Sequence, residues 1–213
     1  MKYFRYFVYL YVFIGYSFSN AGSYDDFFFA IRLDNPTLLS PLLAKGFDPN
    51  TVNPDGQYGL IVALRESSPK VAKVLAEHPA TKVDVRNAVD ESPLMLAALR
   101  GYLELCVTLV SRGAAINKSG WTPLHYAATG GNADIVAMLL KHNAGIDAVA
   151  PNGATPLMMG AMFGSTDVVK QLLDAGADPS LKNAGGQTAL DYAINASRPD
   201  AIALLRKVTQ AKP

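Results

Sequence analysis

The side chains with which this chain could bind a metal ion or attack a substrate are three histidines, His78, His125 and His142, and one cysteine, Cys106. The histidines are far apart in the sequence or fall at repeated positions, and a single thiol completes no zinc-ligand pattern with them. The chain also contains no Gly-rich phosphate loop ending in Gly-Lys-Ser/Thr and no Gly-x-Ser-x-Gly nucleophile elbow. We therefore expect a protein that is not an enzyme, with no catalytic residues, no metal and no cofactor.

The first 21 residues differ from the rest of the chain. Lys2 and Arg5 open the segment, an apolar run follows from Tyr6 to Phe18, and small residues precede a possible cut after Ala21. These are the three parts of a secretory signal, so we expect a signal peptide over 1–21 and export to the periplasm or beyond. The apolar run is shorter than the roughly 20 residues that a membrane-spanning helix needs. The alternatives are an uncleaved anchor that faces the periplasm and, if the segment is neither, a cytosolic scaffold.

The charge and cysteine content of residues 22–213 limit the partners and the compartment that we expect for the protein. The chain has 19 Lys and Arg against 18 Asp and Glu, with no basic cluster of the kind that nucleic-acid binders carry. Loss of Lys2 and Arg5 would leave a net charge of −1, too small to steer a charged partner over a distance. An exported protein with one cysteine has no internal disulfide, which suits a bacterial periplasm. Nucleic acid is therefore not an expected partner.

A repeat of about 33 residues organises the chain. One marker is the leucine of "TPLH" at Leu124, and a second is an aliphatic pair such as Leu139-Leu140, and both recur at nearly the same period. Such a period indicates stacked helix-turn-helix units. The equivalents of Leu124 are Phe27, Leu60, Leu94, Leu157 and Leu190. The predicted units are 24–53, 54–87, 88–117, 118–150, 151–183 and 184–213.

Each unit contains signals for helix ends. A Thr-Pro step, as at Thr122 and Thr155, supplies a capping side chain and a proline for the first helical turn. The second helix is expected to end at a glycine in the left-handed conformation, namely Gly113, Gly145 or Gly176. The units are therefore predicted to be all-α.

These segments resemble the ankyrin repeat. The resemblance is carried by "GWTPLHYAATGGNADIVAMLLKHNAG", "GATPLMMGAMFGSTDVVKQLLDAGADP" and "GGQTALDYAINASRPDAIALLRK", with two weaker units before them. It implies an all-α ankyrin-repeat solenoid of about six helix-turn-helix units with β-turn fingers. It also implies that His125 links adjacent turns by hydrogen bonds. The finger before Trp121 is about three residues short, and the first unit, with its phenylalanines, is expected to form an N-terminal cap.

The resemblance implies that the concave face and the turn tips contact partners. At those positions large apolar residues fall in three consecutive units, where polar residues would serve solubility. Such a patch has the composition of an interface anchor. The alternative is that Met162 and Phe163 fill space between repeats and that Trp121 covers the short turn. The candidate partner-binding residues are Leu99, Arg100, Trp121, Met162 and Phe163.

The expected function is therefore a non-catalytic protein-protein interaction module, exported to the periplasm and monomeric. Its partner is another protein of unknown identity. Two narrower roles remain open from the residues alone: a periplasmic inhibitor or immunity protein against a toxin, or a helper of an envelope enzyme.

Overall fold

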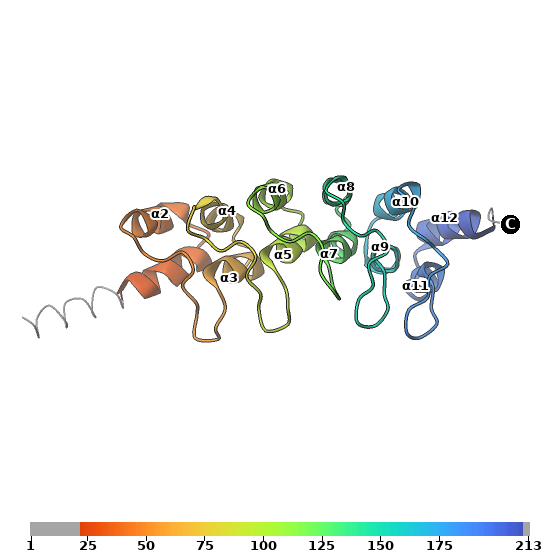
Figure 1. The fold of residues 1–213 in the computed structure, drawn as a ribbon, viewed down its shortest axis with the longest axis horizontal. Helices are drawn as coiled ribbons and strands as arrows, with labels where there is room; N and C mark the ends of the chain where they lie inside the picture. The colour runs from red at the N-terminus through yellow and green to blue at the C-terminus, as the bar shows by residue number, and fades with distance from the viewer. Residues whose placement is uncertain (1–21, 211–213) are drawn as a thin grey trace, which may run out of the picture. The chain divides into compact units, whose positions relative to one another are not determined.

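A computed structural model describes residues 22–210 of the chain. The predicted signal peptide, 1–21, lies outside the described residues. The described residues form two compact units, divided between Lys82 and Val83 (Figure 1). Among the residues described, no helix combines the length and the apolar character needed to cross a membrane.

The first unit contains two helix pairs. Residues 22–32 are helical and are followed by α2 (Pro36–Ala44), and the second pair is α3 (Gly59–Arg65) and α4 (Pro69–Glu77). The loop before α3 closes with a single antiparallel bridge between Val52 and Tyr58. Phe27 is fully buried, and a β-carbon added at Gly59 would lie 2.5 Å from its ring. The first helix therefore packs directly against α3, as expected of an N-terminal cap.

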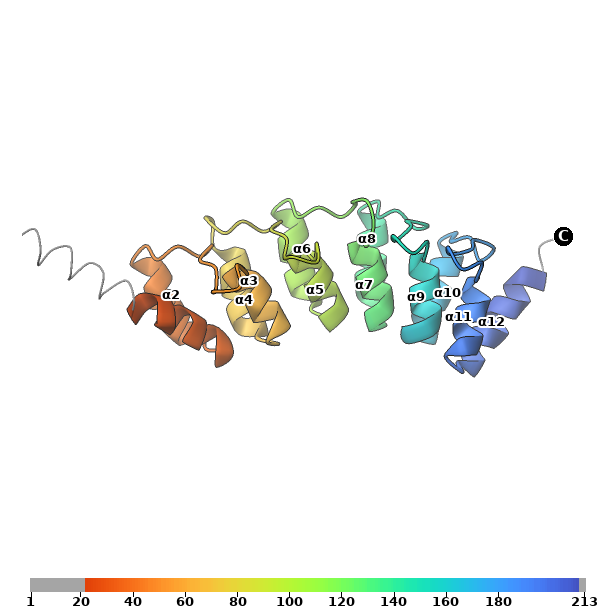
Figure 2. The ribbon, with the colours of Figure 1, turned by 90° about the horizontal axis from the view of Figure 1, so that it is seen from below.

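The second unit contains four helix pairs in two layers. Figure 1 shows α5, α7, α9 and α11 in one row, α6, α8, α10 and α12 in the other, and loops that project as fingers beside the first row. Figure 2 shows the helices of the first row following one another side by side. The finger before α7 is the short one, as its sequence predicts. The pairs are α5 (Pro93–Arg100) and α6 (Leu103–Ser111), α7 (Pro123–Gly130) and α8 (Ala133–Lys141), α9 (Pro156–Phe163) and α10 (Thr166–Asp174), and α11 (Ala189–Asn195) and α12 (Pro199–Gln210).

The predicted helix starts are confirmed. Thr122, Thr155 and Thr188 are the N-caps of α7, α9 and α11, and each side chain accepts a hydrogen bond from the backbone N–H three residues later. A proline occupies the first turn of α7 and α9, where its missing N–H leaves nothing unpaired. These Thr-Pro steps fix where α7 and α9 begin.

One predicted helix end is wrong. Gly113 and Gly176 adopt positive φ angles of 91° and 98°, as expected, but after α8 the left-handed residue is Asn143, with φ 61°, and not Gly145. Asparagine is the residue other than glycine that tolerates this conformation most readily. The turn after α8 therefore keeps its geometry with a different residue, two positions earlier than predicted.

Polar side chains between helices connect successive helix pairs. Asn132, the N-cap of α8, donates to the carbonyl of Ala98 at 2.8 Å, and Ser165, the N-cap of α10, donates to the carbonyl of Gly131 at 3.2 Å. In the first unit, Ser68 donates to the carbonyl of Ile31 at 2.7 Å. Each bond joins the N-terminal end of one helix to a carbonyl at or near the C-terminal end of a helix in the preceding pair.

A second series of bonds runs through the turns that follow α4, α6, α8 and α10. Asp84, Asn117 and Asp147 each accept a hydrogen bond from the backbone N–H of a residue in the next turn, at Ala115, Gly145 and Asp178. The distances are 2.8–3.1 Å. The turns of the second unit are therefore tied together by side-chain oxygens, in addition to helix packing.

Candidate functional site

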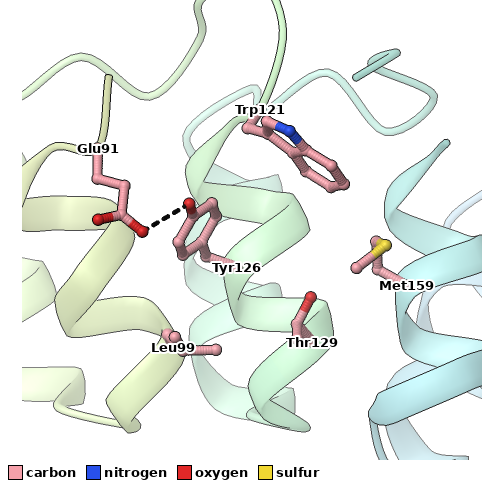
Figure 3. Close-up of a pocket in the computed structure, with 6 residues that line it drawn as sticks. All are labelled: Glu91, Leu99, Trp121, Tyr126, Thr129 and Met159. Carbon is pink, nitrogen blue, oxygen red and sulfur yellow. Dashed lines mark hydrogen bonds between the residues drawn. The ribbon is translucent and has the colours of Figure 1, made fainter. Parts of the chain in front are cut away.

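The second unit has a pocket on the side of its first-row helices. Its volume is about 300 Å³, and its wall is formed by side chains from α5, α7, α9 and the two fingers that precede α5 and α7. Figure 3 shows Tyr126 at the centre, Glu91 and Leu99 on the α5 side, and Met159 on the α9 side. Three successive helix pairs thus contribute to one site. The lining residues are Glu91, Leu99, Trp121, Tyr126, Thr129 and Met159.

A hydrogen-bonded carboxylate forms one wall of the pocket. The hydroxyl of Tyr126 donates to Oε1 of Glu91 at 2.9 Å (Figure 3), and the side-chain amide of Asn87 donates to Oε2 at 2.7 Å. Asn87 Oδ1 also accepts the backbone N–H of Glu91, so the finger and the carboxylate are held together. Burial and the Glu91 carboxylate raise the pKa of Tyr126 well above its usual range. Tyr126 therefore remains a neutral hydrogen-bond donor.

Trp121 forms the opposite wall. Its ring meets the ring of His125 edge to face, with centroids 5.3 Å apart. The ammonium group of Lys118 donates to the carbonyls of Ser119 and Trp121, at 2.9 and 3.2 Å, and so braces the short finger. The indole is half-buried, and its ring contacts the buried ring of His125.

His125 carries the pocket wall and also links two helix pairs. Its Nδ1 accepts the backbone N–H of Thr122 at 3.2 Å, and its Nε2 donates to the carbonyl of Ala154, 29 residues further on, at 3.0 Å. Burial lowers the pKa of His125 to about 4, against the opposing effect of its backbone hydrogen bonds. The ring is therefore neutral at physiological pH and adds no charge beside Trp121. The expected link between adjacent turns is confirmed.

An ion-pair cluster lies on the finger next to Glu91. Asp90 pairs with Lys118 and also lies 3.6 Å from Nε of Arg86, which in turn pairs with Asp84 at 3.0 Å. The hydrogen bond from Lys118 lowers the pKa of the Asp90 carboxyl group. Glu91 takes part in none of these pairs. The cluster holds two carboxylates and two cations, which leaves Glu91 as an additional negative charge.

The structure brings two of the five predicted partner-binding residues together. Leu99 and Trp121 line the same pocket, whereas Arg100, Met162 and Phe163 are not among its lining residues. Phe163, the last residue of α9, is 55% exposed. Met162 is half-buried, and its carbonyl accepts a hydrogen bond from Arg198. The pocket therefore includes only part of the predicted partner-binding set.

Four pocket residues were not among the predicted ones: Glu91, Tyr126, Thr129 and Met159. Tyr126 and Met159 occupy the same position of the repeat, immediately after the residue at His125 and Met158. Two neighbouring repeats therefore carry a large side chain at this position, which is a signal that the sequence contains. No pattern within one repeat indicates that Glu91 lines the pocket, because its hydrogen bond with Tyr126 joins residues 35 positions apart.

Cys106 has the environment of a core residue. It is fully buried in α6, and burial raises the pKa of its thiol to about 12. A nucleophilic cysteine needs a lowered pKa and access to a substrate, and Cys106 has neither. Within residues 22–210, no group of three or more His, Cys, Asp or Glu side chains could hold a metal ion. The pocket itself is lined by apolar and aromatic side chains around one carboxylate, Glu91.

Stacked helix pairs with fingers and a surface pocket define a class of repeat protein that acts by binding. The model of the family described as "Ankyrin repeats (3 copies)" matches residues 27–119, 94–183 and 143–212. The chain therefore belongs to the ankyrin-repeat family, and its fold is the all-α ankyrin-repeat solenoid. This fold is typically non-catalytic and generally mediates binding to other proteins.

Relatives with curated descriptions share the repeats over part of their length. The chain is 30% identical to the B-cell lymphoma 3 protein homolog of Mus musculus over 162 residues, 73% of this chain and 36% of that protein. It is 36% identical to ankyrin repeat and SAM domain-containing protein 6 of Rattus norvegicus over 94 residues, 42% of this chain and 11% of that protein. It is 28% identical to glycerophosphocholine phosphodiesterase GDE1 of Candida albicans over 120 residues, which are 54% of this chain and 10% of that protein. The chain thus spans only a minor part of each of these proteins.

Proposed function

We propose that this chain binds a partner protein through the pocket and the exposed residues around it on α5, α7 and α9. The pocket is the observation that carries the proposal. It sets Leu99, Trp121 and Met159 around a fixed carboxylate, and such a group of aromatic and aliphatic anchors is typical of the residues that dominate binding energy at interfaces. The partner is a protein, because ankyrin repeats generally bind proteins.

We further propose that the protein is exported to a bacterial periplasm as a monomer that has lost residues 1–21. The basic start, the apolar run and the small residues before Ala21 support export. N-terminal sequencing of the protein purified from cells tests it. A mature chain that begins at Gly22 is the expected result, and a chain that retains Lys2 and Arg5 would favour an anchor or a cytosolic protein.

Affinity capture tests the binding surface. Immobilised wild-type protein is exposed to envelope extract and compared with Trp121→Ala, Phe163→Ala and Val107→Ala. Val107 is the matched control, because it is 49% exposed but lies on α6, in the other row of helices. Loss of a central aromatic anchor weakens binding by about tenfold or more.

The expected result is that Val107→Ala retains the proteins captured by wild type, whereas Trp121→Ala loses them with its helical content unchanged by circular dichroism. Phe163→Ala measures whether the surface extends beyond the pocket to the end of α9. Equal capture by wild type and Trp121→Ala would remove the pocket from the proposed interface.

A further inference from the structure

We propose that the pocket binds a lysine or arginine side chain of the partner, with its positive charge against Glu91 and its alkyl chain against Trp121, Leu99 and Met159. This inference rests on the proposed function and specifies the chemistry of its central contact. It assigns Glu91 as the residue that determines specificity.

The first argument is the charge that remains at the site. Within residues 22–210, the cations of the neighbouring ion-pair cluster, Arg86 and Lys118, pair with Asp84 and Asp90. Among the described residues, the side chain of Glu91 is bonded to two neutral groups, the Tyr126 hydroxyl and the Asn87 amide. A carboxylate has about four lone-pair positions, so roughly two stay available for an incoming N–H donor. A cationic donor would make the stronger, charge-assisted bond.

The second argument is that the fold does not need a charge at this position. In the finger before α11, Gln187 occupies the place of Glu91, and Asn183 donates to its side-chain oxygen at 3.2 Å just as Asn87 donates to Glu91. The backbone bonds also correspond, since Asn183 Oδ1 accepts the N–H of Gln187. A neutral amide therefore maintains the finger. The negative charge of Glu91 is an addition that the finger geometry does not explain.

The third argument is the composition and size of the remaining wall. Tryptophan and tyrosine attract a cation to the face of the ring, and Trp121 and Tyr126 both line the pocket. Leu99 and Met159 offer apolar contact to the methylene groups that lysine and arginine carry behind their charge. A volume of about 300 Å³ is at the lower end of the range for ligand pockets, which suits one side chain rather than a whole peptide.

The test uses small probes and the full chain, so it requires no identified partner. Trp121 is the only tryptophan of the chain, so the single indole N–H resonance in a ¹⁵N spectrum reports on the pocket. The probes are N-acetyl-arginine methylamide and N-acetyl-lysine methylamide. The comparison compounds are the citrulline derivative, a neutral isostere of arginine, and the norleucine derivative, which is apolar.

The matched variants are Glu91→Gln, which copies Gln187 and keeps the finger intact, and Asp55→Asn, which removes an exposed carboxylate from a finger of the first unit. We expect both cationic probes to shift the Trp121 indole resonance saturably, and the citrulline derivative to bind at least about tenfold more weakly. Glu91→Gln should abolish this preference and Asp55→Asn should retain it, with circular dichroism and the thermal midpoint confirming that both variants fold.

Three results would overturn the inference: equal binding of the arginine and citrulline derivatives, an unchanged preference in Glu91→Gln, or no saturable shift with either cation up to about 50 mM. Tighter binding of the norleucine derivative would instead assign the pocket to an apolar side chain. None of these results depends on protein capture, so the proposed function can stand or fail separately.

Discussion

The imidazole of His125 performs two tasks that only its neutral form allows. Nδ1 must be free of a proton to accept the backbone N–H of Thr122, while Nε2 donates to the carbonyl of Ala154. Its equivalents Met95 and Met158 retain the first task, because each sulfur accepts the N–H of its own N-cap, Ser92 or Thr155, at 3.4 Å. The second task, a bond to the next helix pair, is what the histidine adds.

His125 should make the stability of the protein depend on pH. Its pKa is about 4 in the folded chain and 6.5 when unfolded, so the unfolded state binds more protons between these values. The contribution of neutral His125 to the free energy of unfolding is therefore largest above pH 6.5, and it is lost as the pH falls from 6.5 toward 4. At pH 5 the loss is about 2 kcal/mol relative to pH 7. Urea unfolding at both pH values measures it.

His125→Met, which copies Met95 and Met158, should lower stability at pH 7 but remove this part of the pH dependence. His142→Gln is the control, since it removes an exposed histidine at the end of α8. A His125→Met profile that matches wild type would mean that other groups cause the acid sensitivity.

The Cys106 thiol should be unreactive in the folded protein. It is buried and its pKa is raised to about 12, so almost no thiolate exists or is reachable at pH 8. We expect no reaction with Ellman's reagent under native conditions and reaction of one thiol per chain in urea. Rapid labelling of the native protein would show that α6 opens far more readily than its packing indicates.

At the scale of the helices, close approach between neighbours determines where glycine is required. A β-carbon at Gly164, directly after α9, would lie 2.3 Å from the carbonyl oxygen of Ala128 on α7. Gly176 has open space around it but a φ of 98°, which strains any other residue. The two glycines are thus required for different physical reasons: contact between helix pairs in one case and backbone conformation in the other.

Alanine substitutions should separate these two reasons. Gly176→Ala should cost about 1 kcal/mol of unfolding free energy, the usual penalty for a left-handed alanine. Gly164→Ala should cost more, about 2–3 kcal/mol, because the contacted atom is backbone and α9 must move away from α7. Urea unfolding measures both, and a cost at Gly164 no larger than at Gly176 would show that the two helices separate easily.

The same helices show what the sequence could predict. The period, the Thr-Pro starts and the burial of Cys106 follow from local residue patterns, and each is confirmed. The left-handed turn at Asn143 does not follow from the positions of the glycines, because asparagine adopts this conformation as well. The pocket was found only in part, because Tyr126 meets Glu91 through the packing of two units, which no single repeat encodes.

At the scale of the whole chain, the second unit is stabilised by contacts between successive helix pairs, since its first-row helices pack α5 on α7, α7 on α9 and α9 on α11. Such an array gains stability from each neighbouring interface and unfolds locally where an interface is weakened. A destabilising substitution in the C-terminal helix pair, α11 and α12, should therefore increase local unfolding of that pair and leave the other pairs folded.

Leu205→Ala tests this confinement. Leu205 is fully buried in α12, and its truncation should cost about 2–5 kcal/mol locally. Hydrogen exchange should accelerate for amides of α11 and α12, while the amides of α7 keep nearly wild-type rates. A uniform acceleration over the second unit would show instead that the four helix pairs unfold together.

The turn-to-turn bonds of Asp84, Asn117 and Asp147 have a consequence for how such a chain can grow. Each side-chain oxygen accepts a hydrogen bond from a main-chain N–H, a donor that nearly every amino acid supplies. A tandem copy of one complete segment would bring both an oxygen for the copy that follows and an amide for the one that precedes, so both new junctions would close. A fragment of a segment would leave one of these groups unmatched, which favours gene duplication in whole multiples of the period.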